Sequence, residues 1–238
     1  PAYPLRLREL ASVPDRLRIR GIWPDPNQRG VAIVGTRAAS RDGEAFARYL
    51  AARLGALGTA VWSGGAAGID RAAHEGALDA LGRTVVVTGA GIDFAYPAHC
   101  QALYDRVIVD GAVVSLSPDG ASPRSFSLLA RNGVLAAMTD ATVVVECPLK
   151  SGARSTSAAA RRLGRPTFIA AQPPWSPFAK TVSEEARLGA QVFTDPDALV
   201  AALLPPPGAP EPLSPIAMRI LDVLREGPLH LDALCDAL

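Results

Sequence analysis

The sequence lacks the features of a secreted, membrane-spanning or metal-organised protein. Its 238 residues include three cysteines, Cys100, Cys147 and Cys235, whose number and wide spacing provide neither a disulfide framework nor a CxxC metal pair. No apolar run approaches the ~18 residues of a membrane span, and the N-terminus lacks the pattern of a signal peptide. We therefore expect a cytoplasmic protein with no membrane partner, no metal and no cofactor.

The chain also has few lysines and a small net charge. Only Lys150 and Lys180 are lysines among 24 basic residues, and the net charge is +1, which argues against nucleic acid binding over the whole surface. Two stretches are nevertheless basic: residues 1–41 carry eight Arg against three carboxylates, and residues 124–165 carry seven basic residues against two acidic ones. Because guanidinium groups fork onto phosphates and stack on bases, this bias is compatible with nucleic acid, although a GC-rich genome would produce it as well.

Hydrophobic residues make up 49% of the chain, enough for a sizeable core. Short Val- and Ile-rich runs alternate with Ala-rich helical segments, which indicates βαβ units, and uninterrupted apolar strands indicate burial on both faces. We therefore predict an α/β fold, a doubly wound Rossmann-like and mostly parallel sheet. The predicted strands are 31–35, 59–64, 84–89, 112–117, 141–147 and 166–171, and the predicted helices are 43–57, 69–81, 127–138, 154–163 and 195–204.

The domain organisation follows from changes in composition. Residues 1–30 are expected to form an N-terminal arm or lead-in strand packed on the core of residues 31–204. The Pro-rich residues 205–215 are expected to be a linker. Residues 216–238 read as the start of a winged-helix-like domain, with a docking hairpin as the alternative. Because the chain starts without Met and stops inside an apparent helix, we expect it to be part of a longer protein.

Two loops after predicted strands could bind an anion, since such sheets bind ligands at the carboxyl ends of their strands. The first contains Thr36 and Arg37 before a helix, a plausible phosphate site. The second, SGGAAGID, could cradle a phosphate through its glycines, with a hydroxyl as a further donor; its residues are Ser63, Gly64, Gly65 and Gly68. It matches neither the dinucleotide fingerprint nor the Walker A pattern, and a close-packed structural turn is the alternative.

A hydrolase site is the weaker interpretation of this region. Asp70 and His74 stand four residues apart on one helix, near Ser63, but no GxSxG motif is present. We expect Asp70 to hold the backbone amides of the glycine loop and His74 to pack beneath it.

Further cations are predicted around the same face. Arg124, Phe126, Arg131 and Asn132 combine charge with an aromatic ring, a mixture that can follow a nucleic acid backbone and stack a base. A helix is expected to begin at a stretch that forms a second candidate anion site, made of Lys150, Ser151, Gly152 and Arg154. Both basic stretches are thus expected to converge on the ligand face.

The motifs VAIVGTRAAS, SGGAAGIDRAAHEGAL, GAGIDFAYP, RN and SGARSTSAAA, in this order, resemble the DNA-processing protein A (DprA/Smf) family of bacteria. The resemblance covers about residues 1–200. It implies a non-enzymatic protein with a Rossmann-like core that dimerises, binds single-stranded DNA and helps to load the RecA recombinase during natural transformation.

By motif, the resemblance assigns the binding of DNA phosphates to a subset of the candidates. These are Arg37, Ser63, Gly64, Gly65, Gly68, Arg131, Asn132, Ser151, Gly152 and Thr156. The chain departs from the family at Ala67 and Gly133, where basic residues are usual, at Leu128, where an aromatic is usual, and over 171–186. The alternatives are a phosphoribohydrolase-like nucleotide enzyme or sensor, whose PGG-x-GT-x-x-E motif is absent, and a structural oligomer.

Overall fold

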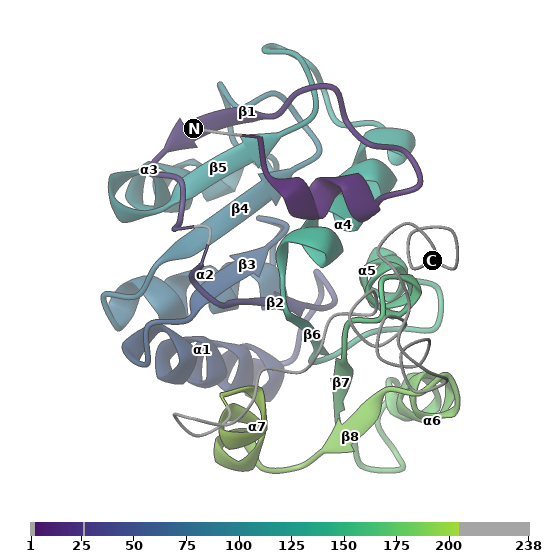
Figure 1. Ribbon diagram of the computed structural model, residues 1–238. Helices are drawn as coiled ribbons and strands as arrows, with labels where there is room; N and C mark the ends of the chain where they lie inside the picture. Colours follow the sequence, from purple (N-terminus) through teal and green to yellow (C-terminus); the bar gives the residue numbers. More distant parts are fainter. Residues whose placement is uncertain (1–2, 26, 205–238) are drawn as a thin grey trace, which may run out of the picture. The chain divides into compact units, whose positions relative to one another are not determined.

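A computed structural model describes residues 3–25 and 27–204 of the chain. These residues form an eight-stranded sheet in the order β1-β5-β4-β3-β2-β6-β7-β8, in which only β1 is antiparallel to its neighbour (Figure 1). The strands are β1 (Arg18–Gly21), β2 (Gly30–Val34), β3 (Ala60–Ser63), β4 (Thr84–Thr88), β5 (Ala112–Ser115), β6 (Ala141–Val144), β7 (Thr167–Ala170) and β8 (Gln191–Phe193).

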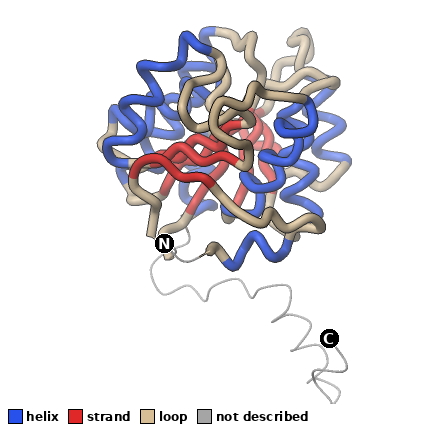
Figure 2. Tube along the Cα trace, turned by 90° about the horizontal axis from the view of Figure 1, so that it is seen from above, coloured by secondary structure: helices blue, strands red, loops and turns tan. Residues whose placement is uncertain are grey.

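Helices cover both faces of the sheet (Figure 2). Helix α1 packs on α2 and α7, and α2 packs on α3, while α4 packs on α5 and on the short 3-10 helix η1. The helices are η1 (Leu5–Glu9), α1 (Arg41–Ala56), α2 (Ile69–Asp79), η2 (Ala98–Cys100), α3 (Gln101–Asp110), α4 (Ser125–Met138), α5 (Gly152–Arg162), α6 (Ala179–Arg187) and α7 (Pro196–Leu203). The predicted doubly wound, mostly parallel architecture is confirmed.

The burial of the strands explains why their sequences are uninterrupted apolar runs. Every residue of β2 to β7 is buried, whereas the edge strands β1 and β8 are partly exposed. Central strands of a parallel sheet are covered on both faces and gain stability from apolar side chains at every position. The edge strands are less buried and also contain polar residues. The short strand β8 therefore has no uninterrupted apolar run and was not predicted.

The six predicted strands and five predicted helices are all present, with ends that differ by a few residues. Helices α3 and α6 were not predicted. The N-terminal residues form η1, against α4, and β1, at the sheet edge beside β5. The domain boundaries remain predictions, and the proposed linker 205–215 and the winged-helix-like segment 216–238 lie outside the described residues.

The direction in which strands are added reverses between β2 and β6. From β2 the chain adds β3, β4 and β5 on one side, and it then crosses to add β6, β7 and β8 on the other. In open α/β sheets this switch point opens a crevice at the carboxyl ends of the two strands. The loops that follow β2 and β6 therefore meet where a ligand is expected. None of the helices in the described part of the chain is long and apolar enough to span a membrane.

Candidate functional site

The glycine loop runs from β3 to α2 at the carboxyl edge of the sheet. The Asp70 carboxylate, in the first turn of α2, accepts hydrogen bonds from the backbone N–H groups of Gly64 at 3.1 Å and Ala66 at 3.4 Å. Burial raises the pKa of Asp70, and the charge of Arg131 opposes this shift. The prediction that Asp70 holds the loop amides is confirmed.

Each glycine of this loop permits a close approach by another part of the protein. A Cβ atom at Gly65 would overlap the hydroxyl of Tyr104, and one at Gly68 would overlap the carbonyl oxygens of Thr36 and Arg37. Gly65 and Gly68 also adopt positive φ angles of 70° and 73°, which glycine tolerates best. These two glycines are required by packing within the protein, the role that the structural alternative assigns to the whole loop.

Gly64 is different because a charged side chain lies on it. A Cβ atom there would overlap the guanidinium of Arg131, which reaches the loop from α4. The Arg131 side chain is only 8% exposed, and no described residue accepts a hydrogen bond from its Nε. Burial lowers the pKa of this guanidinium, while the nearby Asp70 and Tyr104 raise it. The structure thus holds a cation against the glycine loop with unused hydrogen-bonding capacity.

Arg37 lies close to this buried cation. Its side chain is exposed just after β2, and its charge lowers the pKa of Arg131. Thr36 is buried: its N–H donates to the carbonyl of Glu146 at 2.7 Å, and its hydroxyl oxygen accepts from the N–H of Ala38 at 3.2 Å. Arg37 therefore faces solvent at the switch point, whereas Thr36 joins the loops after β2 and β6.

The Ser63 hydroxyl was predicted as a neutral donor to a ligand. In the structure this side chain is completely buried and donates its proton to the carbonyl oxygen of Ile33 at 2.6 Å. A hydroxyl has one proton, so in this arrangement Ser63 connects β3 to β2 and has no donor left for a ligand. The reason is its position as the last residue of a central strand.

Asn132 and the residues around the start of α5 connect two helices. The Asn132 amide donates to the carbonyl of Gly152 at 3.2 Å and to the Ser155 hydroxyl at 2.6 Å. Ser151 caps α5 by accepting from the N–H of Ala153 at 3.2 Å, and Thr156 is buried. The pair Arg131 and Asn132 therefore divides its contacts between the glycine loop and α5.

Three predicted residues at the rim are exposed. Arg124 and Phe126 stand at the start of α4, where the Phe126 ring is 67% exposed, and Lys150 precedes α5. The loops that carry them follow β5 and β6, so they lie at the same edge of the sheet as Arg37. They are available to a ligand that extends along this edge.

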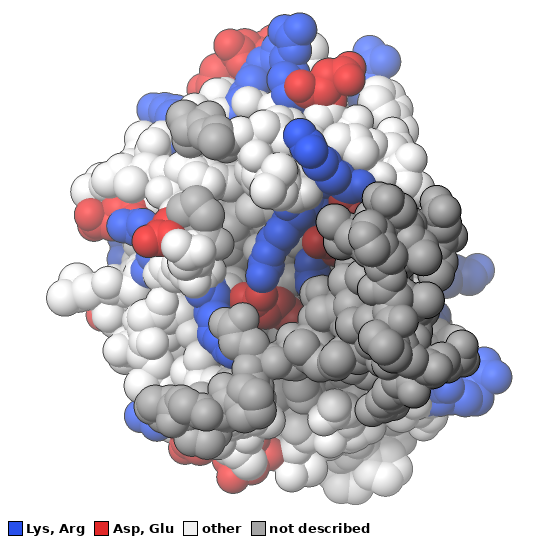
Figure 3. All heavy atoms as spheres, in the orientation of Figure 1, with Lys and Arg blue, Asp and Glu red and all other residues white. Residues whose placement is uncertain are grey.

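The expectation that both basic stretches converge on the ligand face is wrong for part of each stretch. Arg29 and Arg165 stand just before β2 and β7, and Arg6 pairs with Asp140, just before β6. Residues that precede parallel strands lie at the amino edge, away from the ligand face. Figure 3 accordingly shows basic side chains at separate places on the visible face, several of them next to acidic ones.

Two further arginines share one buried carboxylate. Glu185 on α6 is fully buried and accepts hydrogen bonds from Arg154 at 2.7 Å, from Arg161 at 2.7 Å and from the Ser157 hydroxyl at 2.7 Å. Burial raises the pKa of Glu185, but these three partners outweigh it, so that the net shift is downward. Arg154, predicted as part of the second anion site, is therefore already paired with a carboxylate, and together with Arg161 it holds α6 on α5.

The hydrolase interpretation finds no support in the geometry. His74 is fully buried, and its Nδ1 lies 2.7 Å from the Thr84 hydroxyl. Burial and the charge of Arg131 lower its pKa to about 3, so the imidazole stays neutral. His74 is thus buried against the start of β4, in a structural role, and no group of three or more metal-ligating side chains occurs in the described residues.

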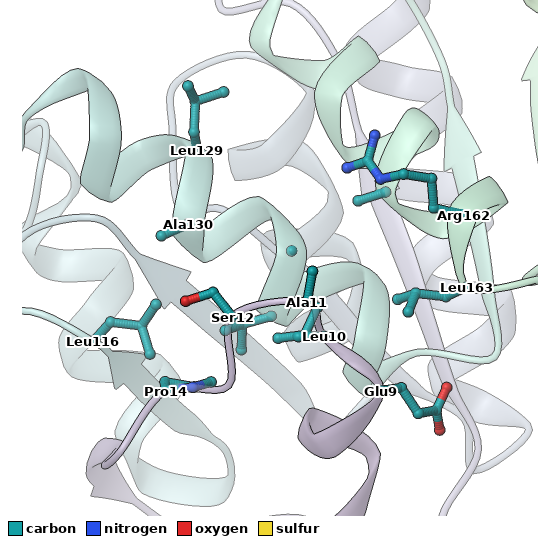
Figure 4. A pocket seen from close by; sticks show the side chains of 13 residues that line it. Glu9, Leu10, Ala11, Ser12, Pro14, Leu116, Leu129, Ala130, Arg162 and Leu163 are labelled. Carbon is teal, nitrogen blue, oxygen red and sulfur yellow. The ribbon is translucent and has the colours of Figure 1, made fainter.

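Sequence reasoning missed an apolar pocket of about 410 Å³ between the segment 9–14, α4 and α5 (Figure 4). Leu10, Leu129 and Leu163 line it, with Arg162 at its side. Its few polar groups give it no chemistry comparable to the Arg131 site. The signal that could have revealed it is the apolar run of α4, which continues onto the exposed Leu129.

The chain is similar in sequence and in fold to known DNA-processing proteins. A family model described as DNA recombination-mediator protein A matches residues 1–204. The putative DNA processing protein DprA of Mycobacterium tuberculosis is 44% identical over 172 residues, which are 72% of this chain and 44% of that protein. The chain thus spans less than half the length of this relative.

Two solved structures extend the comparison. DNA processing protein A from Helicobacter pylori, solved for its single-stranded DNA binding mode, has a TM-score of 0.77 at 26% identity, covering 85% of this chain and 93% of that one. DNA processing protein A from Streptococcus pneumoniae has a TM-score of 0.76 at 30% identity, covering 84% and 70%.

Proposed function

Because the chain belongs to the DNA recombination-mediator protein A family, we propose that it binds single-stranded DNA at the carboxyl edge of its sheet and acts without turnover. The relative from Helicobacter pylori, whose structure covers most of this chain, is a single-stranded DNA-binding protein. The physical support comes from the site itself.

The observation that carries this proposal is the buried guanidinium of Arg131 on Gly64. A buried donor without an acceptor costs about 1–3 kcal/mol, and more for a charged group. The Nε atom is itself inaccessible, so a phosphate oxygen would accept from the Nη groups of this guanidinium and balance its charge, and a charge-assisted bond of this kind is stronger than a neutral one. The exposed Arg37, at the end of β2, supplies a second charge to the same or the next phosphate.

The rim favours a single strand over a single nucleotide. Arg124 and Phe126 on one side and Lys150 on the other extend the cationic edge beyond the Arg131 site. A charged track interleaved with an aromatic ring binds a flexible backbone and stacks bases with little sequence preference. A duplex keeps its base faces stacked inside and cannot use the exposed ring.

The remaining parts of the proposal follow from the family. We propose that the protein works in the cytoplasm as a homodimer, protects incoming DNA and helps to load the RecA recombinase in recombination and natural transformation. The phosphoribohydrolase-like alternative gains nothing from the geometry, since His74 is buried and neutral and the Ser63 proton is used within the sheet.

Fluorescence anisotropy with a labelled oligothymidylate and a matched duplex, over a series of salt concentrations, tests the proposal. Arg37→Ala should weaken binding to the single strand by about 1–3 kcal/mol and reduce the salt slope by about one unit, with little change in stability. Arg187→Ala, an exposed residue near the end of α6 that pairs with Glu184, is the charge-matched control and should bind as the wild type does. Equal affinity for single strand and duplex would refute the proposal.

A further inference from the structure

The structure exposes one tryptophan of three. Trp62 is 3% exposed, and Trp23 packs edge-on against it with ring centroids 5.8 Å apart. Trp175, in the loop between β7 and α6, is 85% exposed. Burying so large an apolar surface away from water would be favourable in free energy. The exposure of this side chain therefore indicates that a ligand or partner covers it.

The loop holds the backbone that carries this indole in a hydrogen-bonded turn. The N–H of Ser176 donates to the carbonyl of Pro173 at 2.9 Å, which closes a turn with Trp175 at its third position. The Ser176 hydroxyl donates to the Gln172 side chain at 3.0 Å and accepts from the N–H of Phe178 at 3.2 Å. The prolines of the sequence PPWSP also restrict the backbone. Because the backbone is already ordered, binding has only the side-chain torsions of the ring left to order.

The loop follows β7 at the same edge as the Arg131 site. The Gln172 amide lies 3.5 Å from the carbonyl of Val145, which connects this loop to the one after β6 that carries Lys150. Because β7 is separated from β2 only by β6, two strand spacings of about 4.8 Å place the loops after β2 and β7 about 10 Å apart. Trp175 is therefore within reach of a strand whose phosphates contact Arg37.

We propose that Trp175 is a stacking platform for a base of the bound single strand, with Lys150 on the neighbouring loop for a phosphate. This inference rests on the proposed function and extends its site by one loop. Exposed prolines at 173, 174 and 177 lie nearest the indole in the chain, but the polar Gln172 and Ser176 and the charge of the exposed Lys180 favour a nucleic acid over an apolar protein partner. A protein interface would require a broad patch with an apolar core around the ring.

The experiment uses the full chain, an oligothymidylate and the same strand with abasic sites. Trp175→Ala should weaken binding of the oligothymidylate about 5- to 150-fold, which corresponds to the loss of one base stack, and Trp175→Phe should retain most of the affinity. The abasic strand should bind the wild type and Trp175→Ala equally, because it offers no ring. Leu188→Ala, which removes another exposed apolar side chain on the far side of α6, should change neither affinity.

Tryptophan fluorescence provides a second readout. The oligothymidylate should quench the wild type and protect it from iodide, and the effect should vanish in Trp175→Phe, since the other two tryptophans are packed together. Unchanged affinity of Trp175→Ala, with normal binding by the wild type, would overturn this inference and leave the proposed function intact. No binding by the wild type would overturn both. An altered self-association of Trp175→Ala with unaltered DNA affinity would assign the ring to a second copy of the chain and overturn the inference.

Discussion

The contact between Gly64 and Arg131 gives the most direct test of the proposed phosphate site. Gly64→Ala adds one methyl group at the position that the Arg131 guanidinium occupies. The backbone tolerates alanine, because Gly64 is not among the residues with positive φ. The added group therefore leaves the loop in place and displaces the end of a flexible side chain.

The cost in folding free energy should be small. Moving the guanidinium to an unfavourable rotamer costs about 0.5–1.5 kcal/mol, and replacing glycine by alanine recovers about 0.4–1 kcal/mol through the unfolded chain. The displaced cation also regains water that it lacks at 8% exposure. We expect the free energy of unfolding in urea to change by less than about 1 kcal/mol.

The cost in binding should be larger. Losing a charge-assisted hydrogen bond weakens binding by about 1.5–3 kcal/mol, or about 10- to 150-fold in Kd. In the Arg131→Ala background, Gly64→Ala should have almost no further effect, because residues that act through one contact are not additive.

Gly133→Ala is the matched control. Gly133 lies on α4, the helix that also carries Arg131. The nearest atom to an added Cβ atom at Gly133 would be Leu10 Cδ2 at 3.5 Å, an ordinary contact. This variant should stabilise α4 by roughly 0.5–1 kcal/mol and leave oligothymidylate binding unchanged. The test is a set of anisotropy titrations with four variants: Gly64→Ala, Gly133→Ala, Arg131→Ala, and the double variant that combines Gly64→Ala with Arg131→Ala. An equal loss of affinity from Gly64→Ala with and without Arg131 would refute the reasoning, because the loop itself would then be the ligand contact.

Two further predictions concern stability. The folded state keeps His74 neutral, since its pKa is lowered to about 3, whereas the unfolded chain takes up a proton below about pH 6.5; stability should therefore fall as the pH drops below that value. Between about pH 7 and 5.5, urea unfolding should show a loss that is about 1 kcal/mol larger in the wild type than in His74→Gln, and equal losses would contradict the assignment. Glu185→Gln leaves Arg154 and Arg161 without their carboxylate and should cost about 1–3 kcal/mol at pH ~7, less than a fully buried pair because both guanidinium groups are partly exposed. The lowered pKa of Glu185 makes its contribution present above about pH 4.3 and lost as the pH falls further, so unchanged urea unfolding of the variant at pH ~7 would be the contrary result.

The fold was predictable wherever one signal dominated the local sequence. Strands β2 to β7 are buried on both faces, so their apolar runs stand out, and the five predicted helices have clear apolar faces. Strand β8 has three residues with exposed positions, and α6 combines a polar sequence with the buried Glu185. That carboxylate is stable only because α5 brings two arginines to it, a contact between distant segments that no local pattern contains.

The site was predictable in its loops but not in the direction of its side chains. The sequence places Ser63, Arg131 and Asn132 near the ligand face, where the structure also has them. Only the structure shows that Ser63 and Asn132 donate their hydrogen bonds to other groups of the protein, whereas the Nε of Arg131 has no acceptor among the described residues. Hydrogen-bond partners depend on the register between β2 and β3 and on the packing of α4 on α5, which are tertiary properties. The same holds for Arg29 and Arg165, since counting charges along the chain does not separate the two edges of a sheet.

The distribution of free donors also determines what the site can recognise. Reading a base requires side chains that present fixed donors and acceptors to its edge, and two candidates for that task, Ser63 and Asn132, use their donors within the protein. The groups left at the carboxyl edge are cations, which contact phosphates, and aromatic rings, which stack on any base. Both kinds of contact are indifferent to sequence, and stacking also requires that the base be unpaired, which a single strand provides. A site built in this way suits a protein that must bind whatever single strand it meets.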